Sequence, residues 1–537
     1  MSRLVSKAKH APSLVGASLL ILILCFAFGL RLAFFFKTNR IVDEYISMLS
    51  IQAILDHGVP VLPSGLFYGP KGVLHSYIGA LAAWVFGASE FVFGFPSVLA
   101  GVLAVSCIYR VGREWFSPVV GATAAMALAW LPSAVQWGGR VRMYSLWQLL
   151  SLVSVYLLVN GYLRESGRRA RVAGIFVMLL AVLSHTLALL TLGGLAAGIA
   201  ASWLISPSRA KPKVNLSFWE VLVIIILIIV IIILNPVAGP WGAQEKMSDA
   251  AQGDLTIQNV SERVLYLVAF THEFVTWPLW PLTLFYAAGF IRLFLRLLKK
   301  SPTSGDWVAV SLYVLVLCAW SATSILSFIQ RDRYLFGILP FYLLLASREL
   351  CSLGQAIAVS VRPFFSRSGA WGVAGVISLL LLVLLAPSTF RLMGDSDSRD
   401  DPRKMSYREF LVSENTSDYV AAYLYVRDHS SPDDTVAACH PAPSQWILGY
   451  ADYYVVEYGA EVHQVGNEMV DNWAGTPLID SPEKFALVLD NHTRVWYLLS
   501  EKCWEYHLGD EFKQLVQQNM QIVFDQSRMR VFVSSAD

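Results

Sequence analysis

Long apolar runs separated by short polar loops make up the first 389 residues of the chain. The first run extends from about Leu14 to Phe36, two closely coupled runs fill 172–206, and the others fall near 92–110, 118–136, 144–163, 218–235, 278–296, 306–328, 334–348 and 370–388. Apolar runs of about 18 residues or more can cross a bilayer as helices. The pattern therefore predicts a polytopic α-helical membrane protein with about eleven spans.

Basic segments indicate which way these spans run. The N-terminal "MSRLVSKAKH" and the loops "RESGRRARV" and "RLLKKS" are basic, and basic loops tend to stay in the cytoplasm. The first run is too long for the core of a signal peptide, so we expect an uncleaved span with a cytoplasmic N-terminus. Residues 43–57 and 71–88 are amphipathic or short and suit the outer interface of the membrane.

The last part of the chain, residues 390–537, has the pattern of a soluble domain. "SDYVAAYLYVRDH" and "DEFKQLVQQN" have helical spacing, whereas "DDTVAACH", "RVWYLLS", "MQIVFDQ" and "MRVFVSS" read as strands. Such a mixture predicts a small layered α/β domain. We expect residues 1–389 to form a transmembrane domain and residues 390–537 an extracytoplasmic α/β domain.

Composition agrees with two environments in one chain. Of the 537 residues, 55% are hydrophobic and 15% are charged, whereas soluble domains carry about 25% charged residues. Residues 390–537 hold 24 of the 39 acidic and 12 of the 41 basic side chains, so this part is acidic. Of the six cysteines, Cys439 and Cys503 are the only possible disulfide pair in it, and the sequence does not decide whether they pair.

Arginines occur at the predicted outer boundary, where the orientation rule disfavours them. Arg140 and Arg142 lie in "WGGRVRMYS", and Arg331 and Arg333 lie in "FIQRDRYLFG". They can extend to lipid headgroups, or they can form an anion site, because guanidinium groups suit phosphate oxygens. Two such clusters on one face, together with Lys71 in "FYGPKGVLHSY", favour the anion site.

Carboxylates, histidines and tyrosines complete the predicted outer face. A carboxylate there can take a proton from an acceptor hydroxyl while cations neutralise a departing phosphate, which is the chemistry of sugar transfer from a lipid phosphate. Each group also has a purely structural interpretation. The acidic pair can cap a helix, one histidine can be buried at the interface, and the His–Glu pair can lie in a solvated turn. The residues concerned are Asp43, Glu44, His75, Tyr144, His272 and Glu273.

Other cofactor or nucleotide chemistry has no signal in the sequence. There is no Walker loop, no GxGxxG motif and no HExxH motif, and we expect no nucleic-acid partner. Glu44, His75 and Glu273 are possible ligands of a divalent metal, but their spacing is not diagnostic of one.

Several segments resemble the GT-C glycosyltransferases. They are "DE" at the start of an amphipathic helix, "YGPKGVLHSYIGALAAWVFGASEFVFGFPSVLAGVLAV", "GREWFSPVVGATAAMALAWLPSAVQWGGRVRMYSLWQL" and "RDRYLFGILPFYLLLA". The chain is most similar to the bacterial branch that includes enzymes like the protein O-mannosyltransferases and the lipid A aminoarabinose transferase. The resemblance is good over about residues 12–206, patchy to 350 and weak beyond.

The resemblance implies roles for particular residues. Asp43 matches the catalytic general base and Glu44 its acidic neighbour, while Lys71, Arg333 and Tyr334 match contacts to the donor phosphate.

Two departures from the pattern concern specificity. Pro70 stands where the aminoarabinose transferase has an acidic residue before the lysine, and an aspartate expected in 137–148 is absent. Metal binding and the choice of donor and acceptor therefore need not follow that enzyme.

The sequence thus predicts a glycosyltransferase of the plasma (inner) membrane. It would move a hexosyl or pentosyl group from a polyprenyl-phosphate donor to a hydroxyl of a glycan, lipid or protein acceptor on the outer face. A transporter or lipid flippase is the main alternative, but the chain shows no inverted repeat, and its charges gather at one face. A non-catalytic subunit of a glycan-assembly complex is the other alternative.

Overall fold

The computed structural model describes residues 14–69, 72–164, 167–206, 279–299, 302–326, 332–361, scattered positions between 372 and 384, and 417–534. The helices up to residue 361 are α2 (Leu14–Lys37), α3 (Val42–His57), α4 (Val73–Phe86), α5 (Glu90–Trp115), α6 (Pro118–Trp130), α7 (Pro132–Gly138), α8 (Tyr144–Leu163), α9 (Arg168–Ser184), α10 (Ala188–Ile205), α14 (Trp280–Leu298), α15 (Ser304–Leu326), the 3-10 helix η2 (Asp332–Leu335) and α16 (Leu339–Val361).

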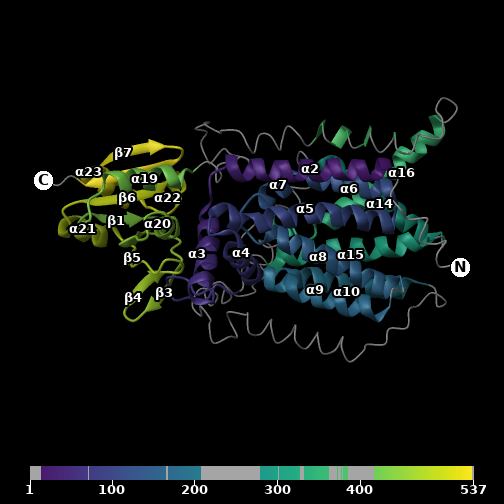
Figure 1. Ribbon diagram of the computed structural model, residues 1–537, viewed down its shortest axis with the longest axis horizontal. Helices are drawn as coiled ribbons and strands as arrows, with labels where there is room; N and C mark the ends of the chain where they lie inside the picture. The colour runs from purple at the N-terminus through teal and green to yellow at the C-terminus, as the bar shows by residue number, and fades with distance from the viewer. Residues whose placement is uncertain are drawn as a thin grey trace.

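The long helices run side by side as a bundle, and α3 crosses the end of the bundle at a steep angle (Figure 1). Among the described residues, six helices are long and apolar enough to span a membrane, or seven if the bent pair α6–α7 is one span. The chain is therefore an integral membrane protein, as the apolar runs predicted. The predicted runs 218–235 and 370–388 lie wholly or mostly outside the described residues, so the count of about eleven stays a prediction.

The bend of 64° between α6 and α7 follows from Pro132. Proline has no N–H to donate to Leu128 O, and it forces Leu131 into an extended conformation (φ −62°, ψ 127°). The buried Arg31 of α2 replaces the missing donor: its guanidinium lies 3.3 Å from Leu128 O, 3.4 Å from Ala129 O and 3.0 Å from Ala27 O. An arginine inside the first span thus stabilises a helix break in another span.

Residues 417–534 form the α/β region. Its helices are α19 (Tyr419–His429), α20 (Pro441–Ile447), α21 (Pro482–Asn491), α22 (Glu501–Tyr506) and α23 (Asp510–Asn519). Its strands are β1 (Thr435–Ala438), β2 (Tyr453–Val455), β3 (Val462–Val465), β4 (Glu468–Asp471), β5 (Leu478–Ile479), β6 (Val495–Ser500), β7 (Met520–Gln526) and β8 (Met529–Ser534).

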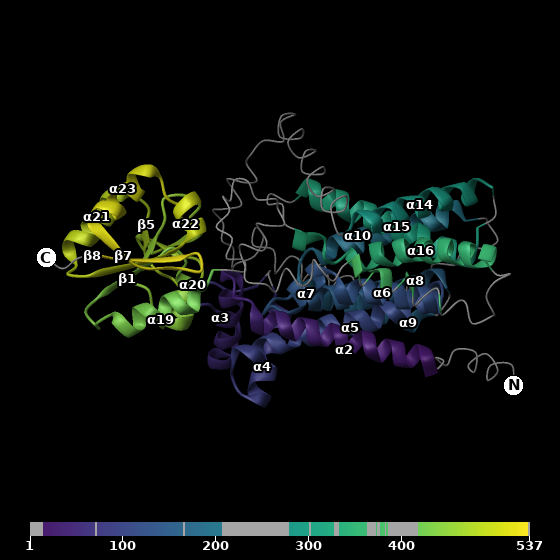
Figure 2. The same cartoon turned by 90° about the horizontal axis from the view of Figure 1, so that it is seen from above.

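The main sheet has the order β5-β2-β1-β6-β8-β7, in which β5, β2, β1 and β6 are parallel and β8 and β7 are antiparallel. Helices α19 and α20 cover one face and α21, α22 and α23 the other (Figure 2). The predicted α/β fold is confirmed, and so are its four predicted strands. The short strands β2 and β5 and the β3–β4 hairpin were not predicted. Cys439 and Cys503 form a disulfide.

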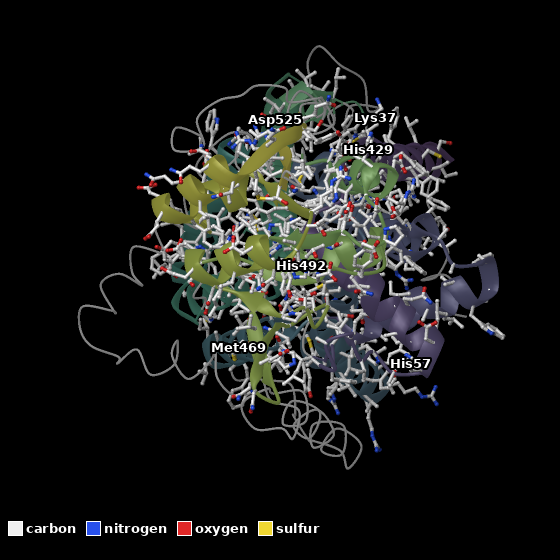
Figure 3. The ribbon with its side chains drawn as sticks, turned by 90° about the vertical axis from the view of Figure 1, so that its left-hand side faces the viewer. Lys37, His57, His429, Met469, His492 and Asp525 are labelled. Atoms are coloured by element: carbon white, nitrogen blue, oxygen red, sulfur yellow. A yellow bond between two sulfur atoms is a disulfide. The ribbon has the colours of Figure 1, made fainter. Side chains whose placement is uncertain are left out.

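The α/β region packs directly on the end of the helix bundle, and it lies in front of much of the bundle when seen from that side (Figure 3). Tyr45 of α3 meets Tyr419 of α19 with 6.0 Å between ring centroids, and Phe93 of α5 meets Trp446 of α20 at 5.9 Å. The Ser64 hydroxyl donates a 2.7 Å hydrogen bond to Asn472 O. One shared core therefore fixes the two parts relative to each other.

The pocket that holds Arg31 exists only because Gly101 and Gly138 have no side chain. A Cβ on either glycine would lie 2.6 Å from Arg31 Nε, and the three carbonyl contacts of Arg31 oppose a shift of its side chain. We expect Gly138→Ala to lower the free energy of unfolding, measured by denaturant titration in mixed micelles, by about 1–3 kcal/mol. Gly29→Ala, on the same helix as Arg31 and with nothing within 4 Å of its Cβ, is the control. Equal stability of the two variants would contradict this account.

Candidate active site

Helix α3 begins with two adjacent acidic residues whose carboxylates lie in different surroundings. Asp43 and Glu44 both lie in its first turn, but the Asp43 side chain is 31% exposed whereas that of Glu44 is fully buried. Successive residues of a helix point about 100° apart, so one acid can face a cavity while its neighbour faces the core. Of the two adjacent acids, Asp43 is therefore accessible and Glu44 is buried.

The Asp43 carboxylate lies between two guanidinium groups. Arg333 Nη1 donates a 2.8 Å hydrogen bond to Asp43 Oδ2, and Arg142 Nη2 lies 3.3 Å from the same oxygen. Arg142 is further held by Asp43 O at 2.8 Å, Ser47 Oγ at 3.0 Å and Tyr68 OH at 3.2 Å. The structure thus joins two arginine clusters, far apart in sequence, at one carboxylate.

Aromatic rings surround these guanidiniums. Arg333 lies 5.7 Å from the ring centroids of Trp137 and Tyr334 and 5.9 Å from that of Tyr144, distances at which cations are attracted to ring faces. Burial alone lowers the pKa of Arg142, but the adjacent Asp43 carboxylate raises it above its usual value. Arg142 therefore stays charged beside Asp43.

Glu44 forms a buried ion pair with Arg140. Arg140 Nη1 lies 2.5 Å from Glu44 Oε2, and the same carboxylate accepts the backbone N–H groups of Val141 at 2.9 Å and Ile41 at 3.1 Å. Arg140 is 1% exposed, and neither side chain lines the cavity described below. The pair ties the start of α3 to the loop between α7 and α8, which positions Arg142.

His75 supports the same loop. It is buried, its Nε2 lies 2.9 Å from Ser97 Oγ, and Ser97 Oγ donates to Arg142 O at 2.8 Å. Tyr144 is buried, and its ring centroid lies 5.6 Å from the Arg142 guanidinium and 5.9 Å from that of Arg333. The other predicted residues, Lys71, Arg331, His272 and Glu273, lie outside the described part of the chain.

A cavity of about 300 Å³ opens over Asp43, between α3 and the α/β region. Asp43 and Arg333 lie on its bundle side. The opposite wall belongs to the α/β region and was not predicted, because no motif marks it. That wall includes Tyr419, His440, Glu461, Asp471, Trp473, Glu501, Lys502, Glu505, Tyr506, His507 and Arg528.

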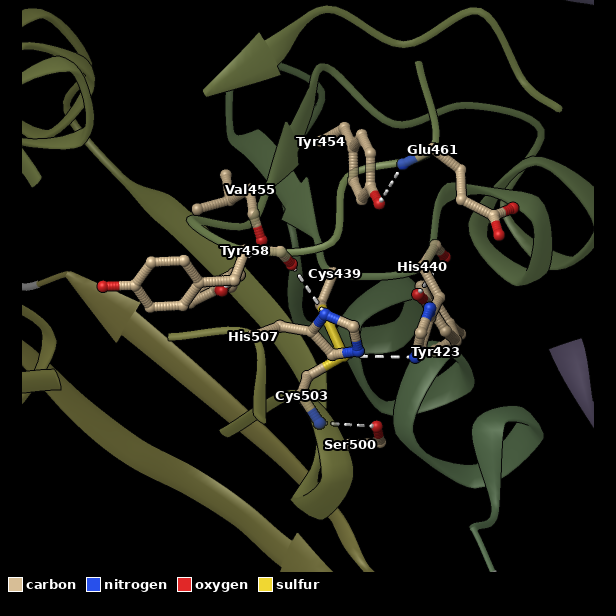
Figure 4. Close-up of a disulfide and its surroundings, with 11 residues drawn as sticks. Tyr423, Cys439, His440, Tyr454, Val455, Tyr458, Glu461, Ser500, Cys503 and His507 are labelled. Atoms are coloured by element: carbon tan, nitrogen blue, oxygen red, sulfur yellow. Dashed lines mark hydrogen bonds between the residues drawn. A yellow bond between two sulfur atoms is a disulfide. The ribbon is translucent and has the colours of Figure 1, made fainter. Parts of the chain in front are cut away.

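The disulfide lies beside this wall (Figure 4). His440 Nε2 is 3.1 Å from Cys503 Sγ, and burial, followed by electrostatic interactions with His507 and Lys502, lowers the pKa of His440 to about 3. Cys439, His440 and Cys503 are the one group of three with metal-ligand spacing among the described residues. Because metal-binding sulfur is a thiolate and these sulfurs are bonded to each other, the group does not fit a metal.

Comparison with known proteins identifies the fold. Residues 70–234 match the family model of dolichyl-phosphate-mannose-protein mannosyltransferases, and no curated protein sequence matches the chain. ArnT from Cupriavidus metallidurans bound to undecaprenyl phosphate is similar over 96% of this chain and 98% of that one, with a TM-score of 0.59 and 13% identity. The chain has the GT-C fold. The predicted resemblance is therefore confirmed.

Further GT-C structures agree with this assignment. ArnT in the apo state gives a TM-score of 0.55 at 14% identity, over 97% of this chain and 99% of that one. The oligosaccharyltransferase AglB from Archaeoglobus fulgidus, in complex with an inhibitory peptide and a dolichol-phosphate, gives 0.51 at 12% identity, over 97% of this chain and 74% of that one. At these identities the likeness concerns the fold, so the chemistry of the GT-C protein must be argued from its own residues.

The buried Glu44–Arg140 pair leads to a stability prediction. Glu44→Gln removes the negative charge that contacts the buried Arg140 guanidinium, so we expect a loss of about 3–5 kcal/mol in the free energy of unfolding, measured in mixed micelles. Replacing both residues by glutamine removes the buried positive charge as well and should recover part of that loss. Wild-type stability of the single variant would show that the pair does not hold the loop.

Asp471 leads to a pH prediction. Burial raises its pKa from 3.8 to about 7, although backbone N–H groups of residues 473–475 oppose this shift. A raised folded-state pKa means that the folded protein binds the proton more tightly than the unfolded chain. The resulting stabilisation is fully present below about pH 4 and is lost as the pH rises to about 7.

We expect Asp471→Asn to flatten the dependence of the melting temperature on pH between 4 and 7, measured on the full chain in detergent. The asparagine side-chain oxygen can still accept from Ala474 N, so the turn is kept. Asp480→Asn, which removes a half-exposed carboxylate paired with Lys484, is the matched control. Parallel profiles for wild type and Asp471→Asn would refute the assignment.

Proposed function

We propose that this protein transfers a sugar from a polyprenyl-phosphate-linked donor to an acceptor hydroxyl, with Asp43 as the general base. One observation carries the proposal: Asp43 is an accessible carboxylate in a cavity at the end of the bundle, and Arg142 and Arg333 contact it. The site combines a proton acceptor with phosphate-binding cations at the depth where a lipid phosphate meets water. A structural cap alone would not need two arginines at its carboxylate.

The chemistry balances with these groups. Asp43 takes the proton of the acceptor hydroxyl, whose oxygen attacks the anomeric carbon of the donor sugar. The bond between that carbon and the phosphate oxygen breaks, and its electron pair leaves with polyprenyl phosphate. The arginines stabilise the negative charge that develops on this leaving group.

Arg333 is the cation placed to exchange partners. It is 16% exposed whereas Arg142 is 5% exposed, and Arg142 donates three further hydrogen bonds, to Asp43 O, Ser47 Oγ and Tyr68 OH, which hold it to α3 and to the loop after α3. A donor phosphate entering the cavity competes with Asp43 for Arg333, because both are anionic. Donor binding then frees the carboxylate to accept a proton. Lys71 is a further phosphate contact on the strength of the sequence resemblance.

The distribution of basic segments supports a membrane topology for this function. The N-terminus lies in the cytoplasm and the α/β region outside the plasma (inner) membrane, because the N-terminal segment and several loops between spans are basic and basic segments tend to stay in the cytoplasm. The transferred group is a hexosyl or pentosyl unit. A divalent metal can assist at the donor phosphate, and chelation tests this.

We expect Asp43→Asn to lower kcat by about 10²- to 10⁴-fold while donor binding is kept or strengthened, because the base that competes for Arg333 is lost but the arginines remain. The measurement is release of polyprenyl phosphate from a panel of short-chain polyprenyl-phosphate sugars by purified protein in detergent, with and without EDTA. Asp56→Asn is the matched control, because Asp56 is an exposed carboxylate at the other end of α3. Arg333→Gln should weaken donor binding in the same panel.

The outcomes separate the possible functions. Turnover by Asp43→Asn at the wild-type rate would remove Asp43 from the mechanism. Tight binding of polyprenyl phosphate without turnover of any donor by wild type would favour a lipid transporter or a non-catalytic subunit.

A further inference from the structure

The wall of the cavity opposite Arg333 has its own chemistry. Of the side chains that the α/β region places there, four are carboxylates, Glu461, Asp471, Glu501 and Glu505, and two are basic, Lys502 and Arg528. Arg528 Nε lies 3.7 Å from a Glu501 oxygen, so one cation is already paired within the wall. The three glutamates outnumber the two cations by one, and Asp471, whose pKa burial raises to about 7, adds part of a negative charge at neutral pH. The wall therefore carries a small net negative charge, and it disfavours an anionic ligand.

Aromatic rings stand among these carboxylates. Trp473 is half-buried, and its indole N–H donates a 3.0 Å hydrogen bond to Glu461 Oε2, which fixes the ring beside the acid. Tyr506 is 50% exposed in the same wall. A carboxylate accepts several hydrogen bonds, so Glu461 can bind a ligand hydroxyl as well as the indole.

The loop that carries Trp473 is held rigidly on the helical part. Ser64 Oγ donates to Asn472 O at 2.7 Å, and His463 Nδ1 lies 3.1 Å from Asn472 Oδ1. Gly475 adopts φ +77° and packs so closely that a Cβ would lie 2.9 Å from Ser64 Cα. Trp473 is thus preorganised relative to α3 and Asp43, which lowers the entropic cost of binding.

From these observations we infer that the α/β wall is the acceptor subsite and that it takes a neutral, polyhydroxylated glycan. This inference rests on the proposed function for the role of the bound glycan, but not for binding itself. A sugar ring has an apolar C–H face that packs on an aromatic ring and hydroxyls at its edge that donate to carboxylates. With the donor phosphate at Arg333, a glycan on this wall lies in the same cavity as Asp43 and can present a hydroxyl to it.

The test measures binding in the Asp43→Asn background, where no turnover interferes. Purified full-length protein in detergent is titrated with neutral tri- to hexasaccharides, with the same sizes containing a uronic acid, and with a serine- and threonine-rich peptide. We expect the neutral saccharides to bind and the acidic ones to bind at least about tenfold more weakly, because the wall repels anions.

Variants assign the subsite. Trp473→Ala should weaken saccharide binding at least about tenfold, whereas Tyr450→Ala, at an exposed tyrosine outside the cavity, should leave it unchanged. Glu461→Gln keeps the size of the side chain and should also weaken binding. It therefore tests the subsite even if Trp473→Ala does not fold. Binding that is unaffected by both cavity variants, equal binding of acidic saccharides, or binding of the peptide alone would overturn the inference.

Failure of this inference and failure of the transferase proposal give different results. Trp473-dependent saccharide binding without turnover of any donor by wild type would keep the subsite and reject the transferase. Donor turnover without saccharide binding would keep the transferase and reject the subsite.

Discussion

The balance of charge at the start of α3 is the constraint on which the site depends. Three arginines lie at a membrane boundary, where an unpaired charge is costly, and two adjacent acids compensate them. Glu44 holds Arg140 in the core, and Asp43 meets Arg142 and Arg333 at the edge of the cavity. The Glu44–Arg140 pair fixes the backbone at the start of α3. Asp43 and Arg333 can therefore exchange partners without unfolding the site.

In this arrangement the α7–α8 loop has to lie next to the start of α3, and the break between α6 and α7 places it there. Pro132 ends α6 early and turns α7 by 64°, which brings the loop under α3. The carbonyl groups freed by the break would be unsatisfied in an apolar bundle, and Arg31 bonds them. A residue of the first span therefore helps to place the arginine that contacts Asp43.

The α/β region closes the site from the opposite side. Its strands and disulfide form an ordinary layered fold, but α19, α20 and the loop after β4 pack on the helical part instead of facing water. The cavity exists only between the two parts, with cations on one side and an acidic, aromatic wall on the other. This polarity suits a phosphate donor and a neutral hydroxyl acceptor bound at the same time.

The sequence by itself determined the spans in the described part, the α/β character of the tail and the GT-C resemblance, because apolar length, strand alternation and ordered motifs are local signals. It also singled out Asp43, Arg142 and Arg333 through their unusual place in the topology. Only the tertiary structure decided that Asp43 faces a cavity while Glu44 is buried, and that Trp473 and Glu461 form the opposite wall. Those relations join residues hundreds of positions apart, and they depend on packing between two parts of the chain, which no local pattern records.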